Sequence, residues 1–313
     1  MAVSLQQFRR AATQLAIRQA IKMTAALPIS VQRSTVRSLI AIAGSIPMLR
    51  SRVRENMLLA LGQDVPAQAE NMYFRQLSWV LSNSLSTFHY GIAATPVLEE
   101  VRLDESIRFL DEAVAQGRGV VLAPAHWCGH ELVAAIINRR HPMAMLVRPA
   151  PTSERATRKL KWYNALGAKI VLRPSGASNF KDAVSYLKVL KRGKLLAITP
   201  DLLADPGQGV ETHIFGRPAR LHGGAFALAN AAKAPMVRFS LRWQSDSSVV
   251  AMFDRAPHFF NSSNRDAAIR TGVQDWCRWF EEKLRANPEN WLFWLDKRWS
   301  HFLRATPRAS GAE

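Results

Sequence analysis

The stretch from His126 to Glu131 reads HWCGHE and gathers several side chains that could do chemistry. It follows the apolar run GVVLAPA, which predicts a buried strand that ends in a loop. Unpaired polar groups are costly beside a buried strand, so these side chains need a partner or a task. Positions five apart on a helix lie about 140° apart around its axis, so His126 and Glu131 meet only if a bend separates them.

A strand, a turn eased by Gly129 and a helix that begins near His130 would provide that bend. Glu131 would then hold one imidazole nitrogen of His126 in its N–H form and leave the other free to take a proton from a hydroxyl. The hydroxyl would attack a thioester carbonyl directly. This interpretation depends on the imidazole and the carboxylate meeting at the mouth of a groove that admits a fatty chain.

Three other interpretations of this stretch stay open. A Cys128 nucleophile requires the strand to persist, because only then do positions 126 and 128 point the same way. A metal site would draw its ligands from the His, Cys and Glu side chains of HWCGHE, but the spacing is neither HExxH nor CxxC, so we expect no metal. In the third, His126 and Glu131 only satisfy a loop. The sequence has no G-x-S-x-G motif that would indicate a serine acyl-enzyme.

The chain has 313 residues, a formal net charge of +18 and two cysteines. The charge predicts an anionic partner, which a lipid surface, an acidic carrier protein or nucleic acid would satisfy. Nucleic acid is disfavoured because the basic residues follow no zinc-finger, helix-turn-helix or RNP-like pattern. Cys128 and Cys277 lack CxxC spacing, so we expect no disulfide framework and a reducing, cytosolic environment.

The first 62 residues carry nine basic side chains and one acidic side chain, Glu55. Their apolar residues are too often interrupted to form a span of about 20, which disfavours a membrane-crossing helix. Because basic residues alternate with Leu, Ile, Met and Val, we expect peripheral or monotopic attachment to anionic membrane lipid. Core-packing helices with a solvated basic face are the alternative.

Hydrophobic periodicity predicts helices first and a sheet afterwards. Pro28 and Pro47 separate two or three helices before residue 62. Short apolar runs then alternate with helical patterns, which predicts an α/β fold with a mixed, largely parallel sheet flanked by helices. The expected strands are 119–125, 143–147, 169–172, 195–199, 235–241 and 248–253, and the expected helices are 66–93, 106–116, 130–139, 153–166, 178–192, 223–232 and 264–286.

These elements suggest a division of the chain into three parts. We expect an N-terminal helical, membrane-associating segment over residues 1–95 and an α/β core over 96–304. Residues 305–313 are expected to form a loose tail, where small and polar residues predominate.

With these motifs in view, the sequence resembles the bacterial lipid A late acyltransferases, the lauroyl and myristoyl transferases of the lysophospholipid acyltransferase superfamily. Their shared mark is HxxxxD or HxxxxE, which His126 and Glu131 match. The segment RENMLLALG is also similar to the family, as are four blocks in family order: QGRGVVLAPAHWCGHELVAA, LVRPAPTSERATRKLKWYNALGAKIV, FGRPARLHGGAFALANAAKAPMV and NPENWLFWLDKRWS. The sequence departs from the family at three places: Gly129-His130 stands where Asn-Trp is usual, Cys128 where Gly is common, and Leu221 where Thr is common. The identity of the acceptor and the length of the acyl chain therefore stay open.

The resemblance implies a glycerolipid-acyltransferase-like fold. It implies acyl transfer from an acyl carrier protein or coenzyme A thioester to a hydroxyl of a lipid A precursor or another phosphorylated glycolipid or lysolipid. The implied place is the cytoplasmic face of the bacterial inner membrane, in lipopolysaccharide biosynthesis. His126 would be the general base and Glu131 its orienting partner, with the thioester as co-substrate and no further cofactor. A metal hydrolase and a non-catalytic membrane-binding protein are the rival functions.

Three arginines in the second block are candidate substrate contacts. Arg148 follows an expected strand, and Arg155 and Arg158 lie on the next expected helix. A guanidinium matches phosphate or carbonyl oxygens, so we expect these side chains to bind substrate. Solvated helix faces are the alternative.

Two further positions complete the candidate site. Asp201, in TPDLLADPGQG, matches an acidic position of the family, and the resemblance implies that its carboxylate supports His126 or the acceptor. The alternative is that Asp201 only stabilises a turn or caps a helix. Gly223 and Gly224 are expected to open a helix whose free N–H groups suit an anion or a passing chain. Tight packing of helix on sheet explains them equally well.

Overall fold

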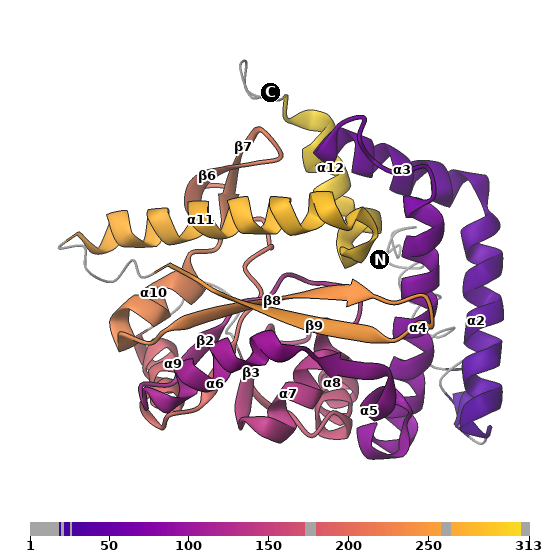
Figure 1. Ribbon diagram of the computed structural model, residues 1–313, viewed down its shortest axis with the longest axis horizontal. Coiled ribbons are helices and arrows are strands. Elements are labelled where there is room, and N and C mark those ends of the chain that lie inside the picture. The colour runs from indigo at the N-terminus through magenta and orange to yellow at the C-terminus, as the bar shows by residue number, and fades with distance from the viewer. Residues whose placement is uncertain (1–18, 20–21, 26, 173–179, 258–263, 308–313) are drawn as a thin grey trace, which may run out of the picture.

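A seven-stranded sheet forms the centre of the molecule, in the order β1-β9-β8-β2-β5-β3-β4 (Figure 1). The computed structural model describes residues 19, 22–25, 27–172, 180–257 and 264–307. The strands are β1 (Val101–Leu103), β2 (Val120–Leu122), β3 (Met143–Val147), β4 (Lys169–Leu172), β5 (Leu195–Ala197), β8 (Met236–Trp243) and β9 (Val249–Arg255).

Strand direction in this sheet places several strand ends together. All neighbouring pairs are parallel except β8 and β9. The strands β2, β5, β3, β4 and β8 therefore share one direction, and their carboxyl ends meet at one edge, where open α/β sheets usually carry their sites. The mixed, largely parallel sheet expected from the sequence is confirmed.

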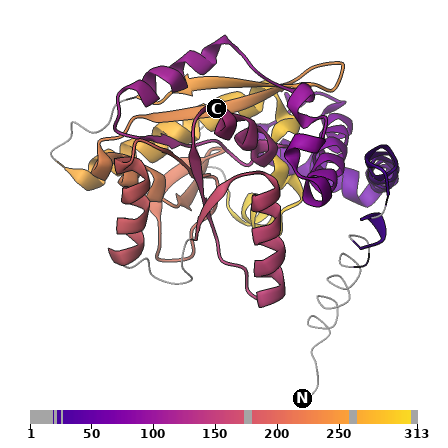
Figure 2. The same cartoon turned by 90° about the horizontal axis from the view of Figure 1, so that it is seen from below.

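Helices precede, connect and cover the strands. The N-terminal helices α2, α3 and α4 stand together at one end of the molecule in both views (Figures 1 and 2). The helix α11 crosses the molecule beside β8. The helices are α2 (Ile29–Ser45), α3 (Pro47–Leu61), α4 (Ala69–Tyr90), α5 (Val97–Glu100), α6 (Arg108–Ala115), α7 (His130–Arg140), α8 (Ser153–Ala165), α9 (Phe180–Lys191), α10 (Gly224–Ala232), α11 (Arg265–Ala286) and α12 (Lys297–Ala305), with short 3-10 turns η1 (Ile92–Ala94), η2 (Glu105–Ile107), η3 (Pro288–Asn290) and η4 (Leu292–Leu295).

Prolines and capping side chains set several helix ends. Pro47 is the first residue of α3, and Ile46 before it is extended (φ −70°, ψ 115°), which ends α2. The side chains of Asn264 and Asp296 accept hydrogen bonds from backbone N–H groups in the first turns of α11 and α12.

Elements that the sequence analysis did not anticipate are β1, α12 and an antiparallel hairpin, β6 (Val210–Ile214) and β7 (Arg217–Leu221). Phe215 and Gly216 form the two-residue turn of this hairpin, both with positive φ, as type I′ turns require. The helix α12 ends at Ala305, the first residue of the expected tail, and residues 308–313 lie outside the described ranges. The three-part division of the chain stays a prediction.

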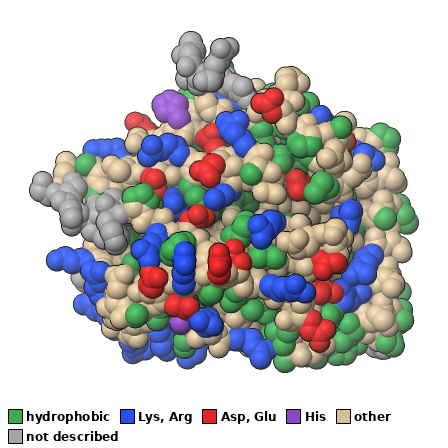
Figure 3. All heavy atoms as spheres, in the orientation of Figure 1, with side chains coloured by type: hydrophobic (Ala, Val, Ile, Leu, Met, Phe, Trp, Pro, Cys, Tyr) green, Lys and Arg blue, Asp and Glu red, His purple; other side chains and the backbone are tan. Residues whose placement is uncertain are grey.

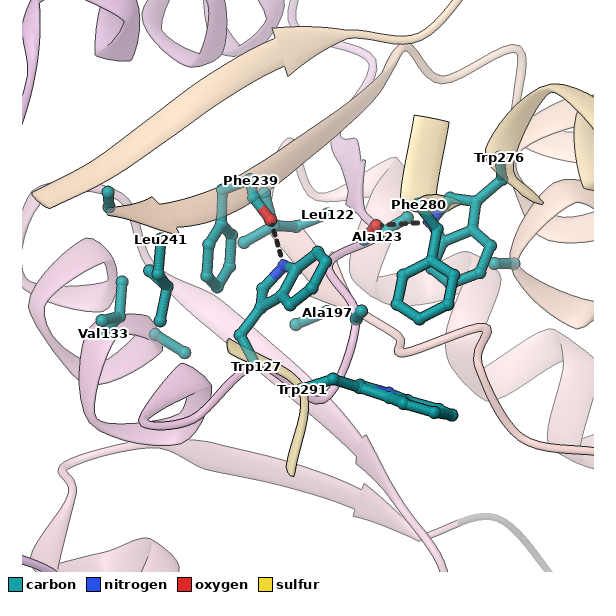
Figure 4. Close-up of a cluster of buried hydrophobic side chains, with 14 of the residues drawn as sticks. Leu122, Ala123, Trp127, Val133, Ala197, Phe239, Leu241, Trp276, Phe280 and Trp291 are labelled. Atoms are coloured by element: carbon teal, nitrogen blue, oxygen red, sulfur yellow. Dashed lines mark hydrogen bonds between the residues drawn. The ribbon is translucent and has the colours of Figure 1, made fainter. Parts of the chain in front are cut away.

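Aromatic side chains fill the core beside the sheet. Trp127, Trp276 and Trp291 are each at most 1% exposed. Figure 4 shows two of them held by hydrogen bonds: Nε1 of Trp127 donates to the carbonyl of Phe239 at 2.7 Å, and Nε1 of Trp276 to that of Ala123 at 2.9 Å. These indoles fix the chain just after β2 against β8 and α11.

Candidate active site

His126 lies on the loop that follows β2, and neighbouring residues hold this loop at several points. Its own carbonyl accepts the N–H of Leu292 at 2.9 Å, and the N–H of Cys128 donates to the carbonyl of Asn290 at 2.7 Å. Together with the Trp127 indole, these bonds tie the loop to both β8 and the segment 290–292. The position of His126 is therefore set by the fold.

Gly129 makes the turn from this loop into α7. Its φ is +97°, and a Cβ atom there would lie 3.0 Å from Cζ3 of Trp79. A side chain at this position would strain the backbone and crowd the indole, so glycine suits this turn. The expected strand, glycine turn and helix starting at His130 are confirmed.

The side chain that pairs with His126 is Asp201, which lies beyond the end of β5. Nδ1 of His126 is 2.6 Å from Oδ1 of Asp201, and the backbone N–H of His126 donates to Oδ2 at 2.9 Å. Because β2 and β5 are adjacent parallel strands, the residues that follow them meet at the same edge. A turn or helix-capping role for Asp201 does not account for these bonds.

Asp201 is fully buried, and its hydrogen bonds keep it ionised. Trp291 donates its Nε1–H to Oδ2 of Asp201 at 2.8 Å, and Trp299 donates to the backbone carbonyl at 3.1 Å. Burial by itself raises the pKa of this carboxyl, but the charge of His126 and the hydrogen bonds from His126 and Trp291 outweigh it, so the pKa lies below its usual value. The carboxylate can therefore hold Nδ1 of His126 in its N–H form.

The other ring nitrogen of His126, Nε2, lies on the side of the ring away from Asp201. Nε2 lies 3.3 Å from the hydroxyl of Thr199, and the His126 side chain is 19% exposed. One face of its ring packs on Phe293, with ring centres 4.4 Å apart. With Nδ1 protonated, Nε2 is the nitrogen that can accept a proton.

A second imidazole, that of His130, lies edge-on to the His126 ring at 4.9 Å between centres. Its Nδ1 is 3.0 Å from the carbonyl of Trp127, so Nδ1 carries the proton and Nε2 does not. Burial and the neighbouring His126 charge lower the pKa of His130. His130 therefore stays neutral beside His126.

The expected pairing of Glu131 with His126 is corrected by these contacts. Glu131 is the second residue of α7, and its carboxylate accepts the Nε1–H of Trp162 at 2.9 Å and the hydroxyl of Tyr163 at 2.5 Å. Both donors lie on α8. The bend in the chain exists, but it turns Glu131 toward α8 and leaves Nδ1 of His126 to Asp201.

Cys128, on the same loop, is fully buried, and its Sγ lies 3.9 Å from the carbonyl of Glu289. Burial raises the pKa of this thiol far above its usual value, with the Glu289 charge adding to the rise. A buried thiol that stays protonated is a poor nucleophile. Over the described ranges, no group of three or more His, Cys, Asp or Glu side chains is arranged to hold a metal ion.

The candidate substrate residues lie around the same edge of the sheet. Arg148 directly follows β3, and its Nη2 is 3.2 Å from Nε2 of His222, just before α10. Arg155 and Arg158 lie on α8, where Arg158 is 3.9 Å from the carboxylate of Glu154. Substrate binding by these arginines stays a prediction.

The two glycines before α10 differ in their surroundings. A Cβ at Gly223 would lie 2.7 Å from Cγ2 of Val210 and 3.0 Å from that of Ile269, so close packing requires glycine there. Nothing lies within 4 Å of a Cβ at Gly224, which begins the helix and is exposed. An anion at this helix start stays a prediction.

Two cavities, of about 1020 and 710 Å³, are lined by residues other than His126. The larger is bounded by the β6–β7 hairpin, α11 and α12, and the smaller by α2, α4 and the β8–β9 turn. Neither is lined by His126, so the groove expected at this residue stays a prediction. None of the helices in the described part of the chain is long and apolar enough to cross a bilayer.

A buried carboxylate that orients a histidine at the carboxyl edge of an α/β sheet is an arrangement typical of enzymes that use the histidine as a base. A family model described as bacterial lipid A biosynthesis acyltransferase matches residues 4–301, nearly the whole chain. The chain belongs to this family, whose activity is acyl transfer in lipid A biosynthesis. A search of curated proteins finds no match.

Proposed function

We propose that this protein moves a fatty acyl chain from the thioester of an acyl carrier protein or coenzyme A to a hydroxyl of a lipid A precursor or related phosphorylated glycolipid. The observation that carries the proposal is the 2.6 Å contact between Nδ1 of His126 and the buried carboxylate of Asp201. With Nδ1 held in its N–H form, Nε2 is the ring nitrogen that can accept a proton. Membership in the acyltransferase family supplies the reaction class.

The proposed reaction is a direct transfer. Nε2 of His126 takes the proton of the acceptor hydroxyl as the oxygen attacks the thioester carbonyl carbon. The carbon–sulfur bond then breaks, the new ester remains, and the leaving thiolate takes the proton back from the imidazolium. Asp201 stabilises the imidazolium that forms in between, and such general base catalysis contributes roughly 10²- to 10⁴-fold in rate.

The hydroxyl of Thr199 indicates where the acceptor would bind. It lies 3.3 Å from Nε2, on the side of the ring away from Asp201. An acceptor hydroxyl must come within hydrogen-bond reach of Nε2, so it would replace Thr199 as the partner of this nitrogen. The Phe293 ring fixes the plane of the imidazole for that approach.

We further propose that the protein works at the cytoplasmic face of the bacterial inner membrane, attached peripherally. Leu39, Ile42 and Met48 are 59%, 63% and 65% exposed on α2 and α3. Exposed Arg37 and Arg52 lie on the same two helices. Apolar side chains mixed with basic ones suit a helix that rests on anionic lipid.

Lipid analysis and kinetics test the proposal together. Mass spectrometry of the lipids of host cells with and without this gene should show one acyl chain missing from lipid A when the gene is absent. With purified protein, His126→Ala should lower acyl transfer by about 10²-fold or more, and a chelator should have no effect.

The alternatives give different results in the same assays. If the acyl chain is missing from another lipid instead of lipid A, the acceptor is a different lysolipid and the reaction is still acyl transfer. A metal hydrolase would release free fatty acid or phosphate and fail with chelator. A protein that only binds membrane would leave the lipids unchanged and would be indifferent to His126→Ala.

A further inference from the structure

The larger cavity, named here the hairpin cavity, lies between the β6–β7 hairpin, the start of α11, and α12, and segment 203–206 forms another part of its wall. Figure 1 shows the hairpin above α11 with α12 beside it. Its volume of about 1020 Å³ would hold a ligand of substantial size. The reaction proposed above assigns no task to it.

Positive charge prevails in the lining of the hairpin cavity. Four cations line it, Arg220, Arg270, Lys297 and Arg298, against one acidic side chain, Glu211. Arg220 pairs with Glu211, and Arg298 pairs with Asp205 at 3.1 Å. Within the described ranges, Arg270 and Lys297 form no ion pair.

Arg270 on α11 and Lys297 on α12 line the hairpin cavity, and neither is engaged in an ion pair in the part of the chain that the structure describes. Because four cations and only one acidic side chain line the cavity, its field favours an anion. Guanidinium and ammonium groups are the usual protein partners of phosphate. Leu203, Pro218 and Phe302 add apolar surface. Charge and apolar surface together suit a phosphate ester with a partly apolar chain.

The hairpin cavity shares its wall with the segments that hold Asp201. Leu203 lines the cavity and follows Asp201 by two positions, so their Cα atoms are at most about 7 Å apart. On α12, Trp299 donates to the carbonyl of Asp201 at 3.1 Å, while its neighbour Arg298 lines the cavity. A ligand in the cavity thus lies close to the residue that orients His126.

We propose that the hairpin cavity binds the phosphate-bearing end of the acyl donor, the 4′-phosphopantetheine group that coenzyme A and acyl carrier proteins share. The identity of this ligand rests on the proposed function, because only a thioester donor brings such a group to His126. The phosphate meets Arg270 and Lys297. The pantetheine chain covers the apolar wall and carries the thioester toward His126.

Calorimetric titration of the full-length protein tests this site with a matched pair of ligands, 4′-phosphopantetheine and pantetheine. The phosphate should strengthen binding by at least about tenfold, as charge-assisted contacts to phosphate do. The double variant Arg270→Gln/Lys297→Gln should lose that advantage. The control Arg118→Gln/Arg139→Gln removes two exposed charges outside both cavities, and it should keep the advantage. Circular dichroism should confirm that both variants are folded.

Several results would overturn the donor site. If 4′-phosphopantetheine and pantetheine bind with equal affinity, the phosphate has no role in binding. If the control variant loses the phosphate advantage as the cavity variant does, the advantage comes from the net charge of the protein. A third arm uses sedimentation with phosphatidylglycerol vesicles: if the cavity variant weakens only vesicle binding, the phosphate belongs to a lipid headgroup.

Binding needs no turnover, so His126→Ala should bind 4′-phosphopantetheine normally. An inactive wild-type protein that still binds it would contradict the proposed function alone.

Discussion

Asp201 and Glu131 are both carboxylates near His126, and their hydrogen bonds give them different tasks. Asp201 accepts bonds from His126 and Trp291, whereas Glu131 accepts bonds from Trp162 and Tyr163 on α8. The HxxxxE spacing identifies Glu131 easily because both residues lie in one short stretch. Asp201 is 75 positions from His126, and spacing cannot reveal a pair that forms only when β5 lies next to β2.

The HxxxxE spacing therefore does not pair Glu131 with His126, because the Glu131 carboxylate bonds to α8. The resemblance to the acyltransferase family gave the better signal, since it singled out Asp201 as an acidic position. The His126–Asp201 contact and family membership are now the support for acyl transfer.

Asp201 should also contribute to stability in a pH-dependent way. Its pKa is lower in the folded protein than in the unfolded chain, where it is about 3.9. Such a carboxyl stabilises the fold above its unfolded pKa, and the contribution is lost as the pH falls through the folded value. The difference in free energy of unfolding between wild type and Asp201→Asn, measured with urea, should be larger at pH 7 than at pH 3. A difference that grows toward pH 3 would show that the sign is wrong.

Cys128 provides a separate residue-scale prediction. Because its thiol is buried and kept protonated, Cys128→Ala should retain acyl transfer within about threefold and cost roughly 1 kcal/mol of stability for the small cavity. Steady-state kinetics and urea unfolding of the variant provide the test. A loss of about 10²-fold in kcat with normal folding would reinstate the thiol as a nucleophile.

At the scale of elements, the sequence predicts the β2–loop–α7 unit and most of the strands and helices because their periodicity is local. The β6–β7 hairpin was not predicted, because its Phe215-Gly216 turn lacks the Asn or Asp that usually precedes Gly in a type I′ turn. The helix α12, which begins with the capping side chain of Asp296, was not predicted either. These two elements bound the hairpin cavity, so this site could not have been found from the expected elements.

Glu131 stabilises the packing of two elements, because its carboxylate joins the start of α7 to α8. Glu131→Ala should remove both bonds, lower the free energy of unfolding by about 2 kcal/mol, and speed backbone hydrogen exchange in residues 153–165. Hydrogen exchange read by mass spectrometry provides the measurement. Tyr163→Phe removes one of the two bonds and should give a smaller effect in the same helix. Unchanged exchange in α8 would contradict the assigned task.

Across the whole molecule, the net charge of +18 does not mean that every basic side chain is available to bind lipid. Arg33 pairs with Glu100 at 2.6 Å, and Arg50 and Arg54 lie 3.5 and 3.6 Å from Glu70, so part of the N-terminal charge holds α2 and α3 to the rest of the molecule. On the side of the molecule drawn in Figure 3, acidic side chains lie among the basic ones. Net charge predicts that an anionic partner exists, but not where it binds.

Membrane attachment is the prediction at this scale. The protein should float with vesicles that contain phosphatidylglycerol at low salt and be released as ionic strength rises, because Debye screening weakens its basic contacts. Leu39→Gln/Ile42→Gln should weaken flotation at every salt concentration. No flotation with anionic vesicles at moderate salt would count decisively against the attachment.

The most direct measurement of the central claim is the kcat for acyl transfer by Asp201→Asn and by Glu131→Gln, each checked for a folded structure. If Asp201 orients His126, Asp201→Asn should lower kcat by about 10²-fold or more. Glu131→Gln keeps an acceptor oxygen for α8, so its kcat should fall by less than about tenfold. The reverse order would contradict the account and return the orienting role to Glu131.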